Sequence, residues 1–484
     1  MSLTKVTNSM IAGAPGNIVN YGAVGDGITG CSSAINSALA DYDSVIVYGG
    51  DFLIDSNLTV ASGKSLIILN GGKLKIATGV TLTISGTIEA GDYEIFTLVG
   101  TGKVTFNIAT TVYAGWWDSW SSDAGIAWSA AVASLPLNKR GSIRLPGEGT
   151  IKTTVNMTQL QSGARKQFEV IGASNGTTLN VEGSIIAVDC TGSEHLSFSN
   201  FRLRGSESSP PTIAFYLARD LDYGYSFQHR FSNVLIDGNW SKACVYSYAS
   251  EENLFHDCKF ITTGTGSCLW ITGDNDGTGE DVVSPYVDVV TGAWSNTANV
   301  YRDTAFVTYG SAPLVKIRGA SDHTFDGCYY QHSSTTDYSV YIDGFGTSSN
   351  RLYFSNSRFE QGSGTKPLYN IYADCSSISY ISGITLRNIV SNAYTAFFGS
   401  ASLMIVQYMN LSGITYNPVV GNKIVSSAQL KFSDLSIPYG TITSGNFEGG
   451  RLFCNASGFS GGYPDSSITD NRSGITYVDN AVIP

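Results

Sequence analysis

Two acidic residues, Glu252 and Asp322, hold the same position in a short pattern that recurs along the 484-residue chain. Each lies three residues before the aromatic residue that opens the pattern, Phe255 or Phe325. Residues at one position on successive turns of a stacked β-structure lie about 4.8 Å apart per turn. If one further turn separates them, the two carboxyl groups fall in the roughly 6.5–9.5 Å range of a glycosidase that acts with inversion. The alternative for this pair is a solvated acidic turn.

Three more acids are candidates for the same chemistry. Glu251 is the neighbour of Glu252, and Asp303 ends an acidic segment. Glu360 belongs to a second position of the pattern, where we expect Arg387 on the next turn to stack against it. An adjacent guanidinium group stabilises the charged carboxylate and suits a nucleophile or a base rather than an acid. A ladder of salt bridges is the alternative for Glu360.

The candidate binding residues are three arginines and two aromatic residues, namely Arg351, Arg358, Arg387, Tyr329 and Trp270. Arginines in a stripe on an acidic protein suit an anionic glycan. The aromatic rings can stack on sugar rings, and packing is the alternative for each of them.

These candidates depend on a repeat of an apolar residue, two turn-like residues, an apolar residue, any residue and an apolar residue. Its instances open at Phe198, Phe231, Phe255, Phe325, Phe354, Ile381, Val406 and Phe432. We expect positions 0, +3 and +5 to point inward. Position +2 is rich in Asn, Asp and Gly, which favour turns, so Asp257 is interpreted as a turn residue rather than a catalytic acid. Short β-like units at this spacing predict a solenoid of stacked strands.

The stretch VGDGITG (24–30) contains the GxGxxG pattern of a dinucleotide-binding turn, and a helix is expected after it over 31–39. From residue 58, however, pairs of apolar residues recur every eight residues and leave no room for further helices. The segment 116–152 repeats the layout, with a helix expected over 123–134, but it lacks the glycines. The glycines are therefore expected to form a tight turn rather than to bind phosphate.

Composition excludes several classes of partner. The 28 basic and 39 acidic residues give a formal charge of −11, which disfavours nucleic acid. No apolar run approaches the ~18 residues of a membrane span, and the N-terminus lacks the apolar core of a signal peptide. The eight cysteines form no CxxC and are expected to be reduced core thiols. The five histidines lack metal-ligand spacing, so we expect neither a metal nor a cofactor.

Two segments resemble the opening of phage tailspike and pectin-lyase-like proteins. The first is VNYGAVGDG…SSAINSAL followed by SVIVYGGDFLI, and the second is VYAGWWDSWSSDAGIAWSAAVASLP…SIRLPGEGTIK. The lead LTKVTNSMIAGAP resembles a tailspike neck. The resemblance implies an all-β fold, a right-handed parallel β-helix with short N-terminal capping helices, assembled as a homotrimer.

The resemblance also implies a function. It suggests a virion protein, made in the host cytoplasm, that contacts other phage tail proteins through its N-terminus and cleaves a bacterial capsular or O-antigen polysaccharide. Endo-glycosidic hydrolysis by a carboxylate pair is the first hypothesis. A lyase acting at a uronate, with His323, Tyr329 and Arg351 as candidates, is the second, and a non-catalytic receptor-binding spike is the third. Between trimer subunits, Glu360 is expected to approach Asp322 across a groove.

The predicted organisation has four parts. They are a neck remnant (1–17), an N-terminal cap with short β-coils (18–113), the main β-helix with a surface excursion near 272–303 (114–440), and a C-terminal cap with trimer contacts (441–484).

Overall fold

The computed structural model describes residues 15–400, with gaps at 138, 158–166, 174–175, 220–225, 276–291, 294–295, 334–337, 344–350, 363–368, 375–384, 388–389 and 392–394, and then four short strands within 410–432. Residues 1–14 of the predicted neck and the predicted C-terminal cap (441–484) lie outside the described residues. The chain forms two compact units, residues 1–155 with 163–179 and residues 156–162 with 180–484. Among the described residues, no helix is long and apolar enough to cross a membrane.

The first unit opens with β1 (Gly16–Asn17), η2 (Ile18–Tyr21), β2 (Asp26–Gly30) and α1 (Ser32–Asp41). The glycine motif forms a turn, as predicted. The Asp26 carboxylate accepts hydrogen bonds from the Ile28 and Thr29 amides at 2.9 and 2.7 Å, and Gly27 has a φ of 71°. These amide donors lower the pKa of Asp26 to about 2. The amides of this turn therefore bind the protein's own carboxylate.

Three parallel sheets form the coils that follow α1. The strands of successive coils are β3 (Ser44–Val47), β4 (Gly50–Ile54) and β5 (Leu58–Val60); β6 (Ser65–Ile68), β7 (Gly72–Ile76) and β8 (Thr81–Ile84); and β9 (Thr87–Glu89), β10 (Phe96–Leu98) and β11 (Lys103–Phe106). Each strand pairs in parallel with its counterpart on the next coil. The eight-residue apolar pairs lie in β5 to β8, and their side chains are buried.

The second predicted opening has the expected layout. It consists of β12 (Thr111–Tyr113), η3 (Ala114–Trp116), η4 (Asp118–Ser121), α2 (Ala124–Ser134), β13 (Arg140–Leu145), β14 (Glu148–Ile151) and β16 (Gln167–Gly172). Asp123 caps α2, because its carboxylate accepts from the Gly125 amide at 2.9 Å and from the Lys152 amide at 3.0 Å. Strands β15 (Val155–Asn156) and β17 (Thr178–Val181) contain boundaries between the two units.

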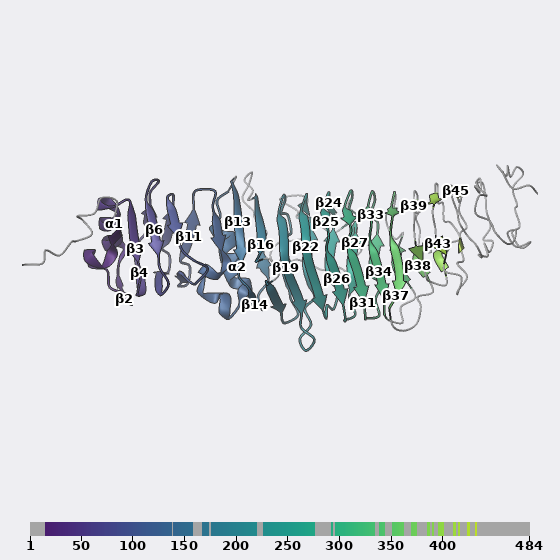
Figure 1. Cartoon of the computed structure of the whole chain (residues 1–484), viewed down its shortest axis with the longest axis horizontal. Coiled ribbons are helices and arrows are strands. Elements are labelled where there is room, and N and C mark those ends of the chain that lie inside the picture. Colours follow the sequence, from purple (N-terminus) through teal and green to yellow (C-terminus); the bar gives the residue numbers. More distant parts are fainter. Residues whose placement is uncertain are drawn as a thin grey trace, which may run out of the picture. The chain divides into compact units, whose positions relative to one another are not determined.

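The second unit is a parallel β-helix, in which each coil contributes strands to two long sheets (Figure 1). The strands of one sheet are β19 (Ser197–Gly205), β22 (Arg230–Gly238), β25 (Leu254–His256), β26 (Lys259–Thr262), β30 (Val300–Arg302), β31 (Ala305–Thr308), β33 (Thr324–Asp326), β34 (Tyr329–His332), β36 (Tyr353–Ser355), β37 (Arg358–Gln361), β39 (Thr385–Arg387), β40 (Val390–Ser391), β42 (Asn410–Ser412), β43 (Thr415–Tyr416) and β45 (Lys431–Phe432).

The second sheet of this unit contains β18 (Ile186–Asp189), β20 (Ile213–Ala218), β23 (Ala243–Tyr248), β27 (Ser267–Thr272), β32 (Val315–Arg318), β35 (Tyr338–Asp343), β38 (Tyr369–Asp374), β41 (Thr395–Ser400) and β44 (Ile424–Val425). Two short pairs lie outside the long sheets: the parallel pair β21 (Ser226–Phe227) and β24 (Ser250–Glu251), and the antiparallel pair β28 (Asp274–Asn275) and β29 (Gly292–Ala293).

An aromatic stack fills the core of the second unit. It consists of Phe198, Phe231, Phe255, Tyr301, Phe325 and Phe354, with neighbouring ring centroids 4.4–5.0 Å apart. From Phe198 to Phe359, the residues predicted at positions 0, +3 and +5 are all buried. The six cysteines in the described part of the chain are likewise buried and free. The inward face of the repeat is therefore confirmed.

The position two residues after each stacked ring is a left-handed turn. The φ angles at Asn200, Asn233, Asp257, Asp303, Gly327 and Asn356 lie between 49° and 67°. The prediction that Asp257 is a turn residue is confirmed. The same assignment applies to Asp303, because Tyr301 opens the additional coil between Phe255 and Phe325.

Two register predictions are wrong. Leu386, rather than Ile381, pairs with Phe354, and Leu411, rather than Val406, pairs with Leu386. Both segments contain two overlapping apolar patterns five residues apart, so one residue fits position +5 of the first pattern and position 0 of the second. The predicted excursion near 272–303 is also too long, because β30 belongs to a coil; residues 276–291 and 294–295 of this excursion lie outside the described part of the chain.

Candidate functional site

One column of turn residues contains the first candidate pair. We call it the turn column; it consists of His195, Gln228, Glu252, Ala298, Asp322 and Arg351, all with φ between 54° and 60°. The coil opened by Tyr301 places Ala298 between Glu252 and Asp322. Two coil steps put the two acidic residues about 9–10 Å apart along the column. The small side chain of Ala298 leaves space between the longer side chains on either side.

Each acid of this pair has one partner on an adjacent coil. The Gln228 side-chain amide donates to Glu252 Oε2 at 2.6 Å. The Arg351 guanidinium donates to Asp322 Oδ2 at 2.5 Å. Glu252 is exposed and the Asp322 side chain is 31% exposed, so solvent reaches both carboxylates. One acid thus has a neutral partner and the other has a cationic partner.

A buried polar network lies directly behind the middle of the turn column, one residue after Gln228, Glu252, Ala298 and Asp322. The Asn253 side-chain amide donates to Asn299 Oδ1 at 2.9 Å, and the Asn299 amide donates to Asn296 Oδ1 at 2.7 Å. His229 and His323 occupy the same position on other coils and are fully buried. Burial lowers the pKa of His229 to about 3 and that of His323 to about 4. Hydrogen bonds between these buried side chains therefore stabilise the turn column.

Glu360 forms a second acidic centre, on the outward face of β37. Its carboxylate accepts a hydrogen bond from the Tyr329 hydroxyl at 2.7 Å and pairs with Arg358. The predicted stacking with Arg387 is wrong, because the Arg387 backbone pairs with Ser355, at the opposite end of this part of the coil. The prediction failed because two apolar patterns overlap at Leu386, which shifted the expected position of Arg387 by five residues.

The other two predicted acids are Asp303 and Glu251. Asp303 is a left-handed turn residue at the end of β30, and its 60% exposed carboxylate lies 3.7 Å from His256 Nε2. Glu251 lies in β24 beside Glu252, and its carbonyl accepts from the Gln228 amide at 3.0 Å. The backbone of Asp303 is that of a turn residue, and the catalytic role of Glu251 stays a prediction.

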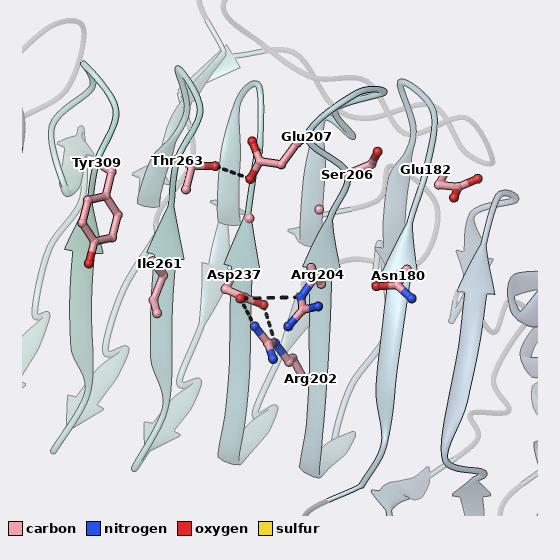
Figure 2. Close-up of a pocket in the computed structure, with 12 residues that line it drawn as sticks. Asn180, Glu182, Arg202, Arg204, Ser206, Glu207, Asp237, Ile261, Thr263 and Tyr309 are labelled. Carbon is pink, nitrogen blue, oxygen red and sulfur yellow. Dashed lines mark hydrogen bonds and ion pairs between the residues drawn. The ribbon is translucent and has the colours of Figure 1, made fainter.

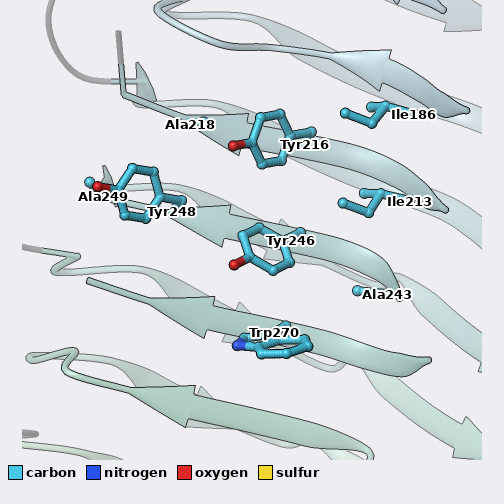
Figure 3. Close-up of a cluster of buried hydrophobic side chains, with 9 residues drawn as sticks. All are labelled: Ile186, Ile213, Tyr216, Ala218, Ala243, Tyr246, Tyr248, Ala249 and Trp270. Atoms are coloured by element: carbon cyan, nitrogen blue, oxygen red, sulfur yellow. The ribbon is translucent and has the colours of Figure 1, made fainter. Parts of the chain in front are cut away.

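Trp270 is part of the packing. It lies in a cluster on the second sheet with Tyr216 and Tyr246, and it is only 8% exposed (Figure 3). The Nζ atoms of Lys242 and Lys316 lie 4.2 and 3.8 Å from its ring centroid. Its faces are thus occupied, so the predicted stacking on a sugar ring is corrected to a packing role.

An open groove of about 470 Å³ lies on the outward face of β19, β22 and β26, and sequence reasoning did not predict it (Figure 2). Arg202 Nε donates to Asp237 Oδ1 at 2.6 Å, and Arg204 Nε lies 3.8 Å from the same carboxylate. Glu207 accepts from the Thr263 hydroxyl at 2.8 Å. Thr263 lies at position +8 of the coil opened by Phe255, so extending the pattern to that position would have found it, whereas Tyr309 belongs to the coil opened by Tyr301, which the pattern did not include.

No family model and no curated protein matches the sequence. A tailspike from Acinetobacter baumannii phage AM24 aligns with 13% identity and a TM-score of 0.39 over 64% of this chain and 55% of its own. A tailspike from A. baumannii phage Fri1, described as a capsular polysaccharide depolymerase, aligns with 9% identity and a TM-score of 0.32 over 60% and 57%. An α-1,3-glucanase from Streptomyces thermodiastaticus aligns with 12% identity and a TM-score of 0.31 over 84% and 69%.

The chain therefore spans little more than half the length of these two tailspikes. The parallel strand register of the chain itself establishes the β-helix. The solved structures that resemble it include phage tailspike proteins, a glucanase, mannuronan C-5 epimerases from Azotobacter vinelandii and a surface adhesin of Streptococcus pneumoniae.

Proposed function

We propose that this protein is a phage tailspike that hydrolyses internal glycosidic bonds of a bacterial capsular or O-antigen polysaccharide. The observation that carries the proposal is the placement of Glu252 and Asp322 two coils apart in one column, with Ala298 between them. This backbone spacing of about 9–10 Å lies at the upper end of the roughly 6.5–9.5 Å between carboxyl groups that an inverting acid and base require, and the two side chains must turn toward Ala298 to reach it.

The partners of the two acids suggest their roles. The positive charge of Arg351 stabilises a carboxylate at Asp322, which suits the base that activates water. Glu252 accepts a hydrogen bond from the neutral Gln228 amide, and its described contacts include no cation. Glu252 is accordingly the proposed acid that protonates the leaving oxygen.

The contacts favour hydrolysis over elimination. A lyase requires a base and a group that neutralises the uronate carboxylate at one place. His323 is fully buried, the Tyr329 hydroxyl donates to Glu360, and Arg351 is bonded to Asp322. The three residues predicted for a lyase therefore form no common site.

The remaining predictions stay proposals. Glu360, with Arg358 and Tyr329 beside it, is the second candidate centre and could act on a chain held between subunits of a homotrimer. The N-terminus is proposed to contact other tail proteins of the virion. Action at the bacterial surface follows from the same proposal.

The test is digestion of a panel of purified capsular and O-antigen polysaccharides. Chain length is followed by size-exclusion chromatography, and the short-wavelength ultraviolet absorbance of a conjugated enol ether reports unsaturated sugars. Shortening without new absorbance is the expected result. Shortening with absorbance would replace hydrolysis by elimination, and binding without shortening would indicate a receptor-binding spike.

A further inference from the structure

The groove is separate from the turn column. Eight residues lie between Gln228 in the turn column and Asp237 in the groove, and most of them belong to β22, at about 3.3 Å per residue. The groove residues lie at the far end of these strands and on the loops that follow them (Figure 2). A ligand in the groove therefore occupies a different face of the coil from a bond held at Glu252 and Asp322.

The charges of the groove exclude one class of ligand. Its lining includes the carboxylates of Glu182, Glu207 and Asp237 and the guanidinium groups of Arg202 and Arg204, which leaves one net negative charge. Arg202 is bonded to Asp237 through two nitrogen atoms, and Arg204 lies beside the same carboxylate. Neither guanidinium is free of a carboxylate, so a chain of uronates or phosphates meets repulsion here.

The other lining groups suit a sugar. Tyr309 is 54% exposed, and its ring borders the groove (Figure 2). Asn180, Ser206 and Thr263 add neutral hydrogen-bonding groups along the floor and rim. An exposed ring beside neutral polar groups can cover the apolar face of a sugar and bond its hydroxyls.

We infer that this groove binds uncharged or amino-bearing sugar residues of a polysaccharide and holds the chain at a place remote from the bond that is cut. The inference rests on the proposed function for the identity of the polymer. It narrows the substrate to glycans with uncharged or amino-bearing stretches and disfavours polyuronates.

The experiment measures binding of the same polysaccharide panel to immobilised protein by biolayer interferometry. The panel is divided into uncharged, amino-sugar and acidic members. Every protein in this experiment also carries Glu252→Gln. This substitution should slow cleavage, so that the bound polysaccharide keeps its length during the measurement. Tyr309→Ala tests the ring, Tyr309→Phe retains it, and Tyr353→Ala removes a tyrosine that is 39% exposed outside the groove.

We expect retention of uncharged or amino-bearing members, a loss of about tenfold in affinity for Tyr309→Ala, and near-parental affinity for Tyr309→Phe and Tyr353→Ala. Equal binding by Tyr309→Ala, retention of acidic members alone, or retention of no member overturns the inference. A matching unfolding temperature shows that Tyr309→Ala remains folded.

The two proposals fail in different ways. If the wild-type chain shortens a glycan and Tyr309→Ala leaves its KM unchanged, the groove inference fails and the hydrolase remains. If Tyr309-dependent binding occurs without shortening by the wild-type chain, the hydrolase fails and the groove inference stands.

Discussion

At the scale of single residues, the candidate acids Glu252 and Asp322 have an unusual backbone conformation. The φ angles of Glu252 and Asp322 are 55° and 60°, where a non-glycine residue loses roughly 1–2 kcal/mol. Such a conformation persists when the surrounding structure holds it, as the Asn253–Asn299 bonds do here. Because the residues share one conformation, their Cα–Cβ bonds leave the column in similar directions, and the carboxylates then bond to partners on opposite sides of the pair, Gln228 and Arg351.

Substitution of the two acids tests their roles. Glu252→Gln and Asp322→Asn should each lower kcat of depolymerisation by at least a hundredfold, because proton transfer contributes about 10²–10⁴. Asp257→Asn is the matched control, since Asp257 is an exposed acid with a left-handed backbone on the same coil as Glu252. Initial rates of chain shortening measure the effect; equal losses in all three variants would contradict the assignment.

The sequence predicted some site residues better than others. Glu252 and Asp322 were found because they precede the stacked rings Phe255 and Phe325 at a constant interval. Tyr309 was missed because the pattern did not include the coil opened by Tyr301, and Glu207 was missed because it lies in the loop after β19, beyond the pattern. Burial of Trp270 depends on neighbouring strands, which a single strand does not reveal.

At the scale of elements, the polar network behind the turn column makes stability depend on pH. The imidazoles of His229 and His323 are neutral and buried, with pKa values lowered to about 3 and 4. In the unfolded chain their pKa is about 6.5. Their contribution to stability is therefore complete above pH ~6.5 and is lost as the pH falls toward 4.

His323→Asn should reduce this dependence, because asparagine occupies the equivalent position at Asn253 and Asn299. The measurement is the unfolding temperature between pH 7 and pH 4.5, with a smaller decline expected for the variant. His256→Asn is the control, since His256 is 49% exposed and should leave the wild-type decline unchanged. An identical decline in His323→Asn would show that acid sensitivity arises elsewhere.

Elements were predicted well where one pattern was unambiguous. Helices α1 and α2 follow their expected ranges, and the core positions of the coils opened by Phe198 and Phe231 are buried. The register failed at Leu386 and Leu411, where two apolar patterns overlap. Pairing with the preceding coil, a non-local contact, decides between such patterns.

For the whole molecule, the proposed homotrimer is open to direct test. Light scattering on purified protein should give the mass of three chains of 51.5 kDa each. The Glu360 centre depends on this result, because a partner subunit is needed to bring a second acid to it. A single-chain mass at micromolar concentration would remove that centre and leave the turn column as the catalytic candidate.

The anomeric configuration of the first product tests the central claim most directly. Proton NMR during early digestion of a cleaved polysaccharide distinguishes the newly formed end before mutarotation. Two acids separated by two coils predict inversion of configuration. Retention would require a pair about 5 Å apart, and it would contradict catalysis by Glu252 and Asp322.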